Sequence, residues 1–554
     1  MTQIDAGLVR RWVRGATDAL RRERAALDRV NVFPVADADT GTNMYLTIRE
    51  SDHAVRAAPG DASGVDLLAT AARAALLGAR GNSGVILSEW LRGAALAARE
   101  DATAATVLEE AARSARAAVA SPADGTILTT ADAAATAGRT TEDAGGGPGA
   151  VTRAAVGAAR TAARTSMTEH PVLAAAGVLD AGACGLVLVL GAFLAATVSD
   201  SPGTMEPVSL DLVVRPRSAA AYTAPEPAAS APRPGAGPGA LELMFVLTRD
   251  VRGAGHVAPR LRSRLEEVGD SVVVVGGDTG GGTAVWQAHV HTDRLPDALA
   301  VAAGSTGDGT LAQVHVRNLE AADPHEWGVV ALAAAPALAA DLAHAGAVVL
   351  LTGGFDARLD AVTPDDVQRA AASTGARRAL VLGDLPPASP DTFEPRSGDN
   401  GGDLDEIVVL DAPTDVHVVV GLAALGTAPD TANPHDVVRA ALDGLRVAGP
   451  VAAPEAVAAL VRLAGAAEPP EVVTALLDDD AAHVAGELTA ALAREAPAAE
   501  LVVLPTGRPG TAVRLGAEPA HAVSPAPEAP DGTADPGTPV TAGRAEHGTP
   551  REGA

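Results

Sequence analysis

Hydrophobic side chains recur every three to four residues through the first 200 positions, which is the period of a helix. The clearest stripe lies within residues 5–30, where arginines separate five apolar side chains: Leu8, Trp12, Ala16, Leu20 and Leu27. Further helical patterns cover 62–79, 84–99, 103–120, 130–138, 150–167 and 183–198. No strand pattern precedes about residue 205, so the sequence predicts an all-helical domain over residues 1–200.

The pattern then changes at a Pro-, Ala- and Ser-rich stretch, residues 201–238, which predicts a linker. A small α/β domain is expected over 239–325. Its strands are predicted at 241–247, 271–275 and 285–291, and its helices at 256–267 and 294–303.

Strand and helix patterns alternate again over residues 326–517, which predicts a larger α/β C-terminal domain. Its strands are expected at 329–333, 347–351, 378–382 and 415–420, and one of its helices at 364–373. The polar segment 386–405 is expected to be a surface insertion. The Pro/Gly/Ala-rich tail, 518–554, is expected to be disordered.

Charge and composition exclude several classes of chemistry. The 554 residues carry a net charge of −27, and all 42 basic residues are arginine because lysine never occurs. An acidic chain is a poor candidate for binding nucleic acid or an anionic membrane. Without lysine, neither a P-loop nor Schiff-base chemistry is available.

Targeting and cysteine signals are sparse. Cys184 is the only cysteine, so an internal disulfide cannot form. The N-terminus lacks the pattern of a signal peptide, and the apolar run 185–198 is short for a bilayer. We therefore expect a cytoplasmic protein without a transmembrane segment. We also expect the apolar run to form a buried helix, and Cys184 to be a small core residue.

The strongest chemical signal is the segment 31–44, in which Asp37 and Asp39 precede Thr40, Thr42 and Asn43. Magnesium prefers hard oxygen ligands and usually binds through one or two carboxylates plus substrate phosphates. The segment can therefore hold a metal–nucleotide complex. The same residues can also form an ordinary Asx-type turn, which is the alternative interpretation.

A second motif, residues 77–87, lies between two predicted helices. Gly81 and Gly84 allow the backbone to approach a ligand closely, and Ser83 and the first amides of the next helix offer donors to an anion. Arg80 adds positive charge. A glycine-rich turn between helices is the alternative.

Two further segments precede helices. In Asp124-Gly125-Thr126, N-capping explains the residues nearly as well as function does. Asp180 lies among apolar residues, where an unpaired carboxylate is costly, so it either caps the helix that begins near Ala183 or orients a ligand. His170 is expected to make a local hydrogen bond.

Together, these four segments in this order resemble the nucleotide-binding DhaL domain of the dihydroxyacetone kinase family. More closely, the chain resembles the ATP-binding component of bacterial fatty acid kinase. The resemblance implies an eight-helix barrel whose rim loops hold ATP through magnesium. The loop departs mildly from the family pattern at Ala36 and Ala38, as do Asp124 and Ala183.

The resemblance also implies roles for individual residues. Asp37 and Asp39 would be the catalytic residues that carry the magnesium ions, and Asn31 stands near a position where the family places a further aspartate. The side chains and turns that would contact the nucleotide are Thr40, Thr42, Asn43, Arg80, Gly81, Asn82, Ser83, Gly84, Thr126, Asp180 and Gly182.

The middle domain contains His289 and His291, which strand alternation places on one face with a spacing suited to sharing a metal. In the resembling family a cysteine from the first strand joins this pair. Here Glu242 stands in that region and offers an oxygen instead, which gives a candidate zinc site. Strand histidines without a metal are the alternative.

These patterns favour an ATP-dependent phosphotransferase. Phosphoryl transfer depends mainly on positioning and charge neutralisation, and a fatty acid carboxylate is already ionised at neutral pH. The leading hypothesis is a kinase that makes an acyl phosphate, with the fatty acid presented, by resemblance, by a DegV-type fatty-acid-binding protein. The alternatives are a dihydroxyacetone-type kinase and a nucleotide-binding regulatory scaffold. A homodimer is left open.

Overall fold

The computed structural model describes most of the chain outside the linker and the tail. The described residues are 4–33, 38–119, 122–198, 240–252, 254–278, 282–321, 326–354, 357–385, 404–429, 432–466 and 468–519. Asp37, the predicted linker, residues 386–403 of the predicted insertion and residues 520–554 of the predicted tail lie outside them.

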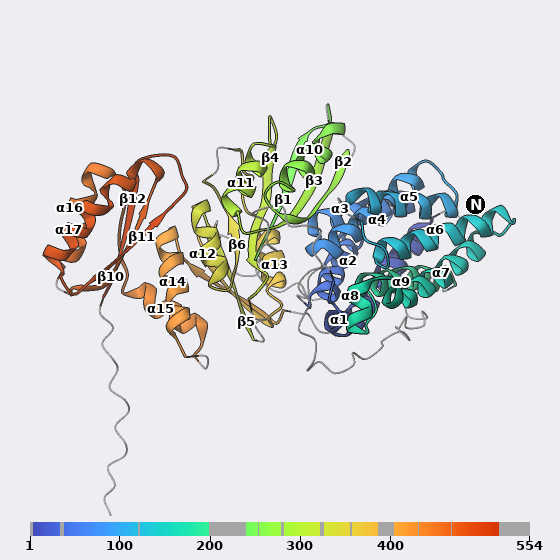
Figure 1. Ribbon diagram of the computed structural model, residues 1–554, viewed down its shortest axis with the longest axis horizontal. Coiled ribbons are helices and arrows are strands. Elements are labelled where there is room, and N and C mark those ends of the chain that lie inside the picture. The colour runs from blue at the N-terminus through green and yellow to red at the C-terminus, as the bar shows by residue number, and fades with distance from the viewer. Residues whose placement is uncertain are drawn as a thin grey trace, which may run out of the picture.

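Within residues 4–198, the described part of the chain forms α-helices joined by short loops (Figure 1). They are α1 (Ala6–Arg29), α2 (Thr40–Ala57), α3 (Gly64–Gly78), α4 (Gly81–Arg99), α5 (Ala104–Ala118), α6 (Ile127–Asp143), α7 (Pro148–Glu169), α8 (Pro171–Ala176) and α9 (Ala181–Val198). Several begin at side-chain caps: Asp5 accepts a hydrogen bond from the Leu8 amide, and Ser63 accepts one from the Asp66 amide. The prediction of a helical N-terminal region is confirmed.

The long helices pack in chain order. Each helix from α1 to α7 contacts the next one, and α9 contacts both α7 and α1. The helix α9 is apolar on all sides and largely buried, which is typical of a core helix. It is also the one helix among the described residues that is long and apolar enough to cross a membrane, although 72% of it is buried within the protein. The eight-helix barrel itself stays a prediction.

The helix α2 was not predicted, and its position changes how the first motif is interpreted. It begins at Thr40, directly after Asp39, and it buries polar side chains such as Glu50, Ser51 and Asp52 together with apolar ones. Buried polar residues blur the apolar stripe from which a helix is recognised. The motif's hydroxyl and amide residues therefore lie in the first turn of a helix.

The second half of the structure contains two sheets (Figure 1). The first has eight strands in the order β2-β3-β1-β4-β6-β5-β7-β8. These strands are β1 (Leu241–Asp250), β2 (Asp270–Asp278), β3 (Thr283–Thr292), β4 (Thr310–Asn318), β5 (Trp327–Ala333), β6 (Ala347–Leu351), β7 (Arg378–Gly383) and β8 (Glu406–Asp411). Strands β1 to β4 pair antiparallel, and β5 to β8 pair parallel, so the sheet is mixed.

The second sheet has four strands in the order β11-β10-β12-β9. They are β9 (Arg446–Ala452), β10 (Pro470–Leu477), β11 (Glu500–Pro505) and β12 (Ala512–Pro519). The α-helices of the second half are α10 (Val257–Leu265), α11 (Leu295–Ala303), α12 (Ala339–His344), α13 (Pro364–Ser373), α14 (Asp415–Thr427), α15 (Pro434–Asp443), α16 (Ala456–Ala464) and α17 (Ala485–Glu495). The prediction of α/β structure after the helical region is confirmed.

The strand expected at 415–420 is wrong, because these residues begin the helix α14. The valines at 416 and 418–420 have the β-branched, apolar character of a buried strand. In the structure Asp415 lies in the first turn of α14, and Val416, Val418 and Val420 are buried. The run is therefore the apolar part of a buried helix.

The eight-stranded sheet is continuous across residue 325, where the sequence predicts a domain boundary. Strand β4 pairs with β6 through two residue pairs, His315 with Leu350 and Val316 with Val349. The predicted domain boundaries stay predictions. For the candidate site, the strand order matters: β3, β1 and β4 are direct neighbours, so they present side chains from a single surface.

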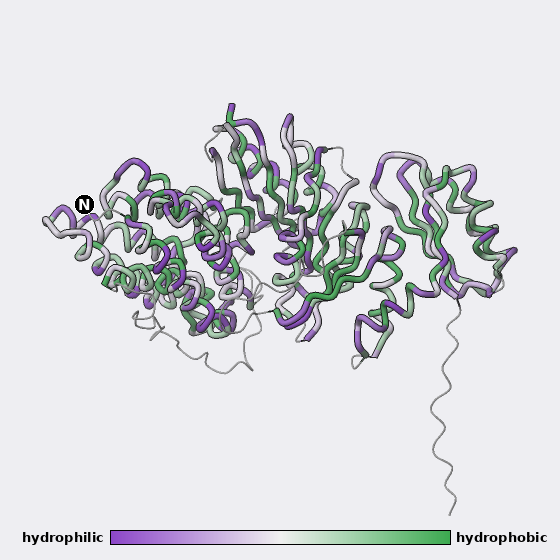
Figure 2. Tube along the Cα trace, turned by 180° about the vertical axis from the view of Figure 1, so that it is seen from behind, coloured by the Kyte–Doolittle hydropathy of each residue, from purple (hydrophilic) through white to green (hydrophobic). Residues whose placement is uncertain are grey.

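That surface packs against the helical region. Met244, Val246 and Val275 of the sheet are buried in one cluster with Leu76 and Val85 of the helices α3 and α4. In Figure 2 the hydrophobic colour follows the strands of both sheets. Polar contacts reinforce the interface: the Gly276 amide donates to Glu89 (3.2 Å), and the Gln287 side-chain amide donates to the Ala79 carbonyl oxygen (3.1 Å).

Candidate functional site

The helix order places the four sequence motifs at one end of the helical region. They occupy the connections α1–α2, α3–α4, α5–α6 and α7–α9, and alternate connections of helices packed up and down lie at the same end. Side-chain contacts join them: the ring of Phe33 lies 4.1 Å from that of His170, and the Thr40 and Ser83 hydroxyls are 3.2 Å apart.

A cavity opens where this end of the helical region meets the eight-stranded sheet. About 290 Å³ of space in it and at its opening is not filled by atoms, part of it open to solvent. Its described lining residues are Asn31, Asp39, Thr40, Asn43, Gly81, Asn82, Ser83, Glu242, His289, His291 and Arg317. The cavity therefore combines the first two motifs with the predicted metal ligands of the middle segment.

A network of short contacts orders the helical side of the cavity. The Thr40 hydroxyl donates a hydrogen bond to Asn31 Oδ1 (2.8 Å) and lies beside Ser83. Gly81 has φ +51°, and a Cβ atom there would lie 2.2 Å from Asn43 Nδ2. The positive φ therefore favours glycine at this position, and a Cβ atom would also displace the side-chain amide of Asn43.

Thr42 has a structural partner outside the cavity. Its amide and hydroxyl both donate to the Asp28 carboxylate, at 2.9 and 2.8 Å, which fixes the start of α2 to α1. Burial raises the pKa of Asp28 to about 6, against the hydrogen bonds from Thr42, and Asp39 raises it further. Negative charge is thus concentrated where the helix α2 begins.

Asp39 contacts a residue that sequence reasoning missed. Arg317, on β4, donates from Nη2 to Asp39 Oδ2 at 2.5 Å and also forms a short ion pair with Glu242. Because no strand was predicted at 310–318, nothing in the sequence pattern placed Arg317 near either carboxylate. This guanidinium joins the helical side of the cavity to the sheet side.

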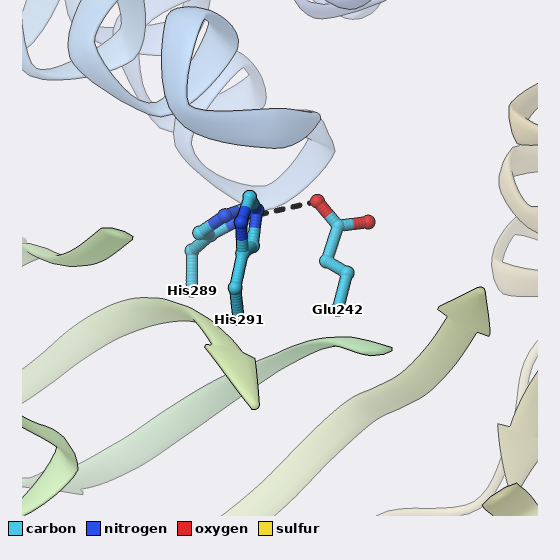
Figure 3. A group of neighbouring side chains, drawn as sticks. All are labelled: Glu242, His289 and His291. Carbon is cyan, nitrogen blue, oxygen red and sulfur yellow. Dashed lines mark ion pairs between the residues drawn. The ribbon is translucent and has the colours of Figure 1, made fainter. Parts of the chain in front are cut away.

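On the sheet side, Glu242, His289 and His291 form a compact group. Glu242 pairs with His291 across β1 and β3, and the ligand atoms of the three residues lie within 4.8 Å of one another. Figure 3 shows the three side chains rising from these strands toward the helical region. All three are buried.

The electrostatics of the group suit a metal. Burial lowers the pKa of His289 to about 3, so its imidazole is neutral. Burial would raise the pKa of Glu242, but Arg317 and then His289 hold it well below its usual value, so the carboxylate is ionised. Nδ1 of His289 lies 3.2 Å from Glu242, yet neither ring nitrogen makes a hydrogen bond to a described residue. Neutral imidazoles and a carboxylate are the protonation states that bind zinc.

Thr126, Asp180 and Gly182 form a separate group at the starts of α6 and α9. The Ala183 amide donates to Asp180 Oδ1 at 2.6 Å, so Asp180 does cap α9. Burial raises the pKa of Asp180 to about 6, against hydrogen bonds from the Ala183 and Ile127 amides. These residues do not line the described cavity, and their contact with a nucleotide stays a prediction.

His170 and Cys184 are structural in character. The backbone amide of His170 donates a local hydrogen bond to the Ser166 carbonyl oxygen (3.0 Å). Nδ1 of its side chain is buried without a partner among the described residues, and its ring packs on Phe33, so a local hydrogen bond of the side chain stays a prediction. Cys184 is buried in the core of the helical region.

The residues of the second motif do not all line the same cavity. Gly84 packs against α2, since a Cβ there would lie 2.3 Å from Thr47 Oγ1. The side chain of Arg80 lines a different cavity from the one that contains Asp39. The remaining members, Gly81, Asn82 and Ser83, line the first cavity.

Residues 34–195 match the DAK2 domain family, and residues 240–325 match the FakA-like middle domain of fatty acid kinase. Protein YloV of Bacillus subtilis is 35% identical over 181 residues, which is 32% of each chain. An uncharacterised protein of Staphylococcus saprophyticus is 32% identical over 216 residues, covering 37% of this chain and 38% of its own. The chain thus spans about a third of the length of the curated relatives it matches.

Among solved structures, dihydroxyacetone kinase from C. freundii in complex with AMP-PNP and Mg²⁺ is similar to part of the chain. The sequence identity is 21%, the TM-score is 0.28, and the similarity covers 35% of this chain and 34% of the kinase.

The helical region with its four motifs is therefore similar to the DAK2 domain family. The segment that follows defines its type more narrowly: this chain carries a DAK2 domain followed by a FakA-like middle domain. The resemblance predicted from the sequence is confirmed.

Proposed function

We propose that the protein is the ATP-dependent component of a kinase that phosphorylates the carboxylate of a fatty acid, which a separate DegV-type fatty-acid-binding protein presents. One observation carries the proposal: the cavity lined by Asp39, Thr40 and Ser83 is closed on its other side by Glu242 and His289. Both family matches therefore contribute residues to a single cavity.

The donor set on the helical side fits magnesium. Asp39, Asn31 and Thr40 offer a carboxylate, an amide oxygen and a hydroxyl, which are the hard ligands that Mg²⁺ prefers. Asp37 belongs to the same proposed metal site. When bound, magnesium would supply positive charge next to the phosphates of ATP.

The protein's own groups would position the phosphates. Ser83 and the first amides of α4 offer donors at a positive helix end, and Arg317 is the arginine that lines the described cavity. The acceptor carboxylate would form a bond to the γ-phosphorus while the bond to the bridging oxygen breaks, and ADP leaves with that electron pair. An ionised carboxylate needs no general base.

Two further functions remain as alternatives. A dihydroxyacetone-type kinase would need to activate a hydroxyl acceptor, and a regulatory scaffold would bind nucleotide without turnover. The proximity of Asp39 to anion-binding groups favours catalysis over a scaffold, and the FakA-like middle domain favours the fatty acid. A cytoplasmic location is part of the same proposal.

ATP consumption separates the three functions. We expect turnover with a fatty-acid-loaded DegV-type protein and none with that protein emptied of fatty acid. Turnover with dihydroxyacetone alone would support the second function. Saturable nucleotide binding without turnover in either case would support the scaffold and contradict the kinase proposal.

The metal assignment has its own test. Asp37→Asn together with Asp39→Asn should abolish Mg²⁺-dependent nucleotide binding in calorimetry, because both proposed carboxylate ligands become neutral. Helical circular dichroism should be unchanged. Asp61→Asn, at an exposed position, is the matched control. Unchanged nucleotide affinity in the double variant would refute the assignment.

We further propose that Glu242, His289 and His291 bind zinc. Elemental analysis of the purified protein should give near-stoichiometric zinc, and His289→Ala with His291→Ala should remove it, because two of three ligands are lost. His344→Ala changes a histidine outside the cavity and should retain the metal. Absence of zinc, or zinc retained in the double variant, would end this part of the proposal.

A further inference from the structure

A second cavity lies where three parts of the chain meet. Arg80 enters it from the start of α4, Gln313 and His315 from β4, and Asp366 and Arg369 from α13. About 210 Å³ of space in it and at its opening is not filled by atoms, part of it open to solvent, and Leu350 and Ala370 complete its described lining. None of these residues lines the first cavity.

Arg80 is a buried cation with no counter-ion among the residues that the structure describes. It is only 6% exposed, and its guanidinium donates one hydrogen bond to them, from Nη1 to the Ala79 carbonyl oxygen at 3.1 Å. It forms no ion pair with a described carboxylate. An uncompensated buried charge is strongly destabilising, so this arrangement calls for a negative partner.

The two carboxylates whose charges act on Arg80 are already paired with other arginines. Glu50 and Glu242 act on Arg80 from a distance, but Glu50 pairs with Arg49 at 3.2 Å and Glu242 pairs with Arg317. Neither carboxylate lines the second cavity. The charge of Arg80 is therefore not balanced by the described residues around it.

The other cavity groups add donors and no surplus negative charge. Arg369 forms a short ion pair with Asp366, which balances those two side chains. Burial, and then the charge of Arg80, lowers the pKa of His315 to about 3, so its imidazole is neutral. Gln313 adds an amide. The described lining thus carries one positive charge in excess, with guanidinium, amide and imidazole groups around it.

We infer that this second cavity binds a phosphate group, with Arg80 as its main partner and Arg369 as the second guanidinium. Phosphate geometry matches the planar fork of an arginine, and several donors around one anion favour a tetrahedral oxyanion. The inference does not depend on the proposed kinase activity, because it uses none of the first cavity's residues.

The test is calorimetric titration of the full chain with inorganic phosphate, in EDTA and without nucleotide, at constant ionic strength. We expect one saturable site and a rise in thermal midpoint with phosphate, since a ligand that binds only the folded state stabilises it. Glycerol 3-phosphate is the second probe: binding of both shows that a phosphate on an organic group fits, and binding of inorganic phosphate alone assigns the free ion. Binding of neither overturns the inference.

Two variants assign the site. Arg80→Gln should weaken phosphate binding at least about tenfold, the loss expected for a charge-assisted hydrogen bond. Arg99→Gln makes the same change at an exposed position of the same helix and should leave the affinity unchanged. Equal affinity in the wild type and in Arg80→Gln would place the phosphate elsewhere and overturn the inference.

Asp366→Asn keeps the inference testable if Arg80→Gln does not fold. This change removes the carboxylate that pairs with Arg369, while an amide can still accept the hydrogen bonds that cap α13. Phosphate affinity should rise severalfold because the positive charge of the cavity increases. An unchanged or lowered affinity would contradict the inference.

Discussion

The buried carboxylate of Asp180 makes the stability of the helical region depend on pH. It caps α9 through the Ala183 amide, and burial raises its pKa to about 6. A carboxyl whose pKa is raised in the folded state stabilises the protein fully below its unfolded pKa, near 3.8, and that contribution is lost as the pH rises through about 6. Above pH 6 the protein therefore holds a buried charge at a cost.

Asp180→Asn should remove this pH dependence, because an asparagine can cap the helix without ionising. Urea denaturation at about pH 8 should find the variant more stable by up to roughly 3 kcal/mol, the equivalent of about two pKa units. At about pH 4.5 the two proteins should differ little. The same stability difference at both pH values would show that Asp180 does not titrate as described.

At the scale of single residues, the sequence predicted most of the side chains that line the helical side of the first cavity and some of those on its sheet side. Thr40, Asn43 and Ser83 were singled out because hydroxyls, amides and glycines clustered in short segments, and the structure places them around the cavity. Arg317, which was not predicted, and Arg80, which was predicted to contact the nucleotide but lines the second cavity, show why the rest could not be predicted. The position of a long arginine side chain depends on tertiary packing, which a local pattern does not contain.

Among the elements, the start of α4 depends on a glycine. Gly81 has positive φ, and its Cα faces Asn43 of α2. Gly81→Ala should strain the backbone and displace the Asn43 side chain, destabilise the protein by about 1–3 kcal/mol in denaturation experiments and weaken nucleotide binding.

Gly157 is the matched control. It is exposed in α7, and a Cβ there would meet nothing within 4 Å. Gly157→Ala should therefore stabilise the protein by about 0.5–1 kcal/mol, because alanine loses less backbone entropy in a helix. Similar stability changes in the two variants would show that the close approach at Gly81 is not required.

Helices with one apolar face were predicted well, and two elements that lack such a face were not. The stripe in residues 5–30 became α1, and the predicted helix at 364–373 is α13. In contrast, α2 buries polar residues, and the valines of α14 have strand character within a helix. Periodicity reports which side chains are buried, and it fails when polar side chains are buried or when apolar ones surround the element.

For the whole molecule, the contact between the helical region and the sheet builds the first cavity. Val246 is 3% exposed in the apolar cluster between them. Val246→Asp should separate the two, because an unpaired carboxylate in an apolar interface is costly. Small-angle scattering should then show a larger radius of gyration, with the circular dichroism of both parts preserved.

Val503→Asp provides the comparison, since Val503 is 37% exposed on β11 and away from this contact. It should scatter like the wild type. If Val246→Asp also scatters like the wild type, then the apolar cluster does not hold the two parts together, and the polar contacts to Glu89 and Ala79 must do so.

The ion pair between Asp39 and Arg317 would have to break when a metal–nucleotide complex binds in the cavity. A carboxylate that neutralises a guanidinium has less charge to offer a divalent cation, so the two partners compete for it. Entry of the cation would then release Arg317 at the moment when phosphate oxygens become available to it. Arg317 would therefore pair with Asp39 before the metal–nucleotide complex binds and with the phosphate oxygens afterwards.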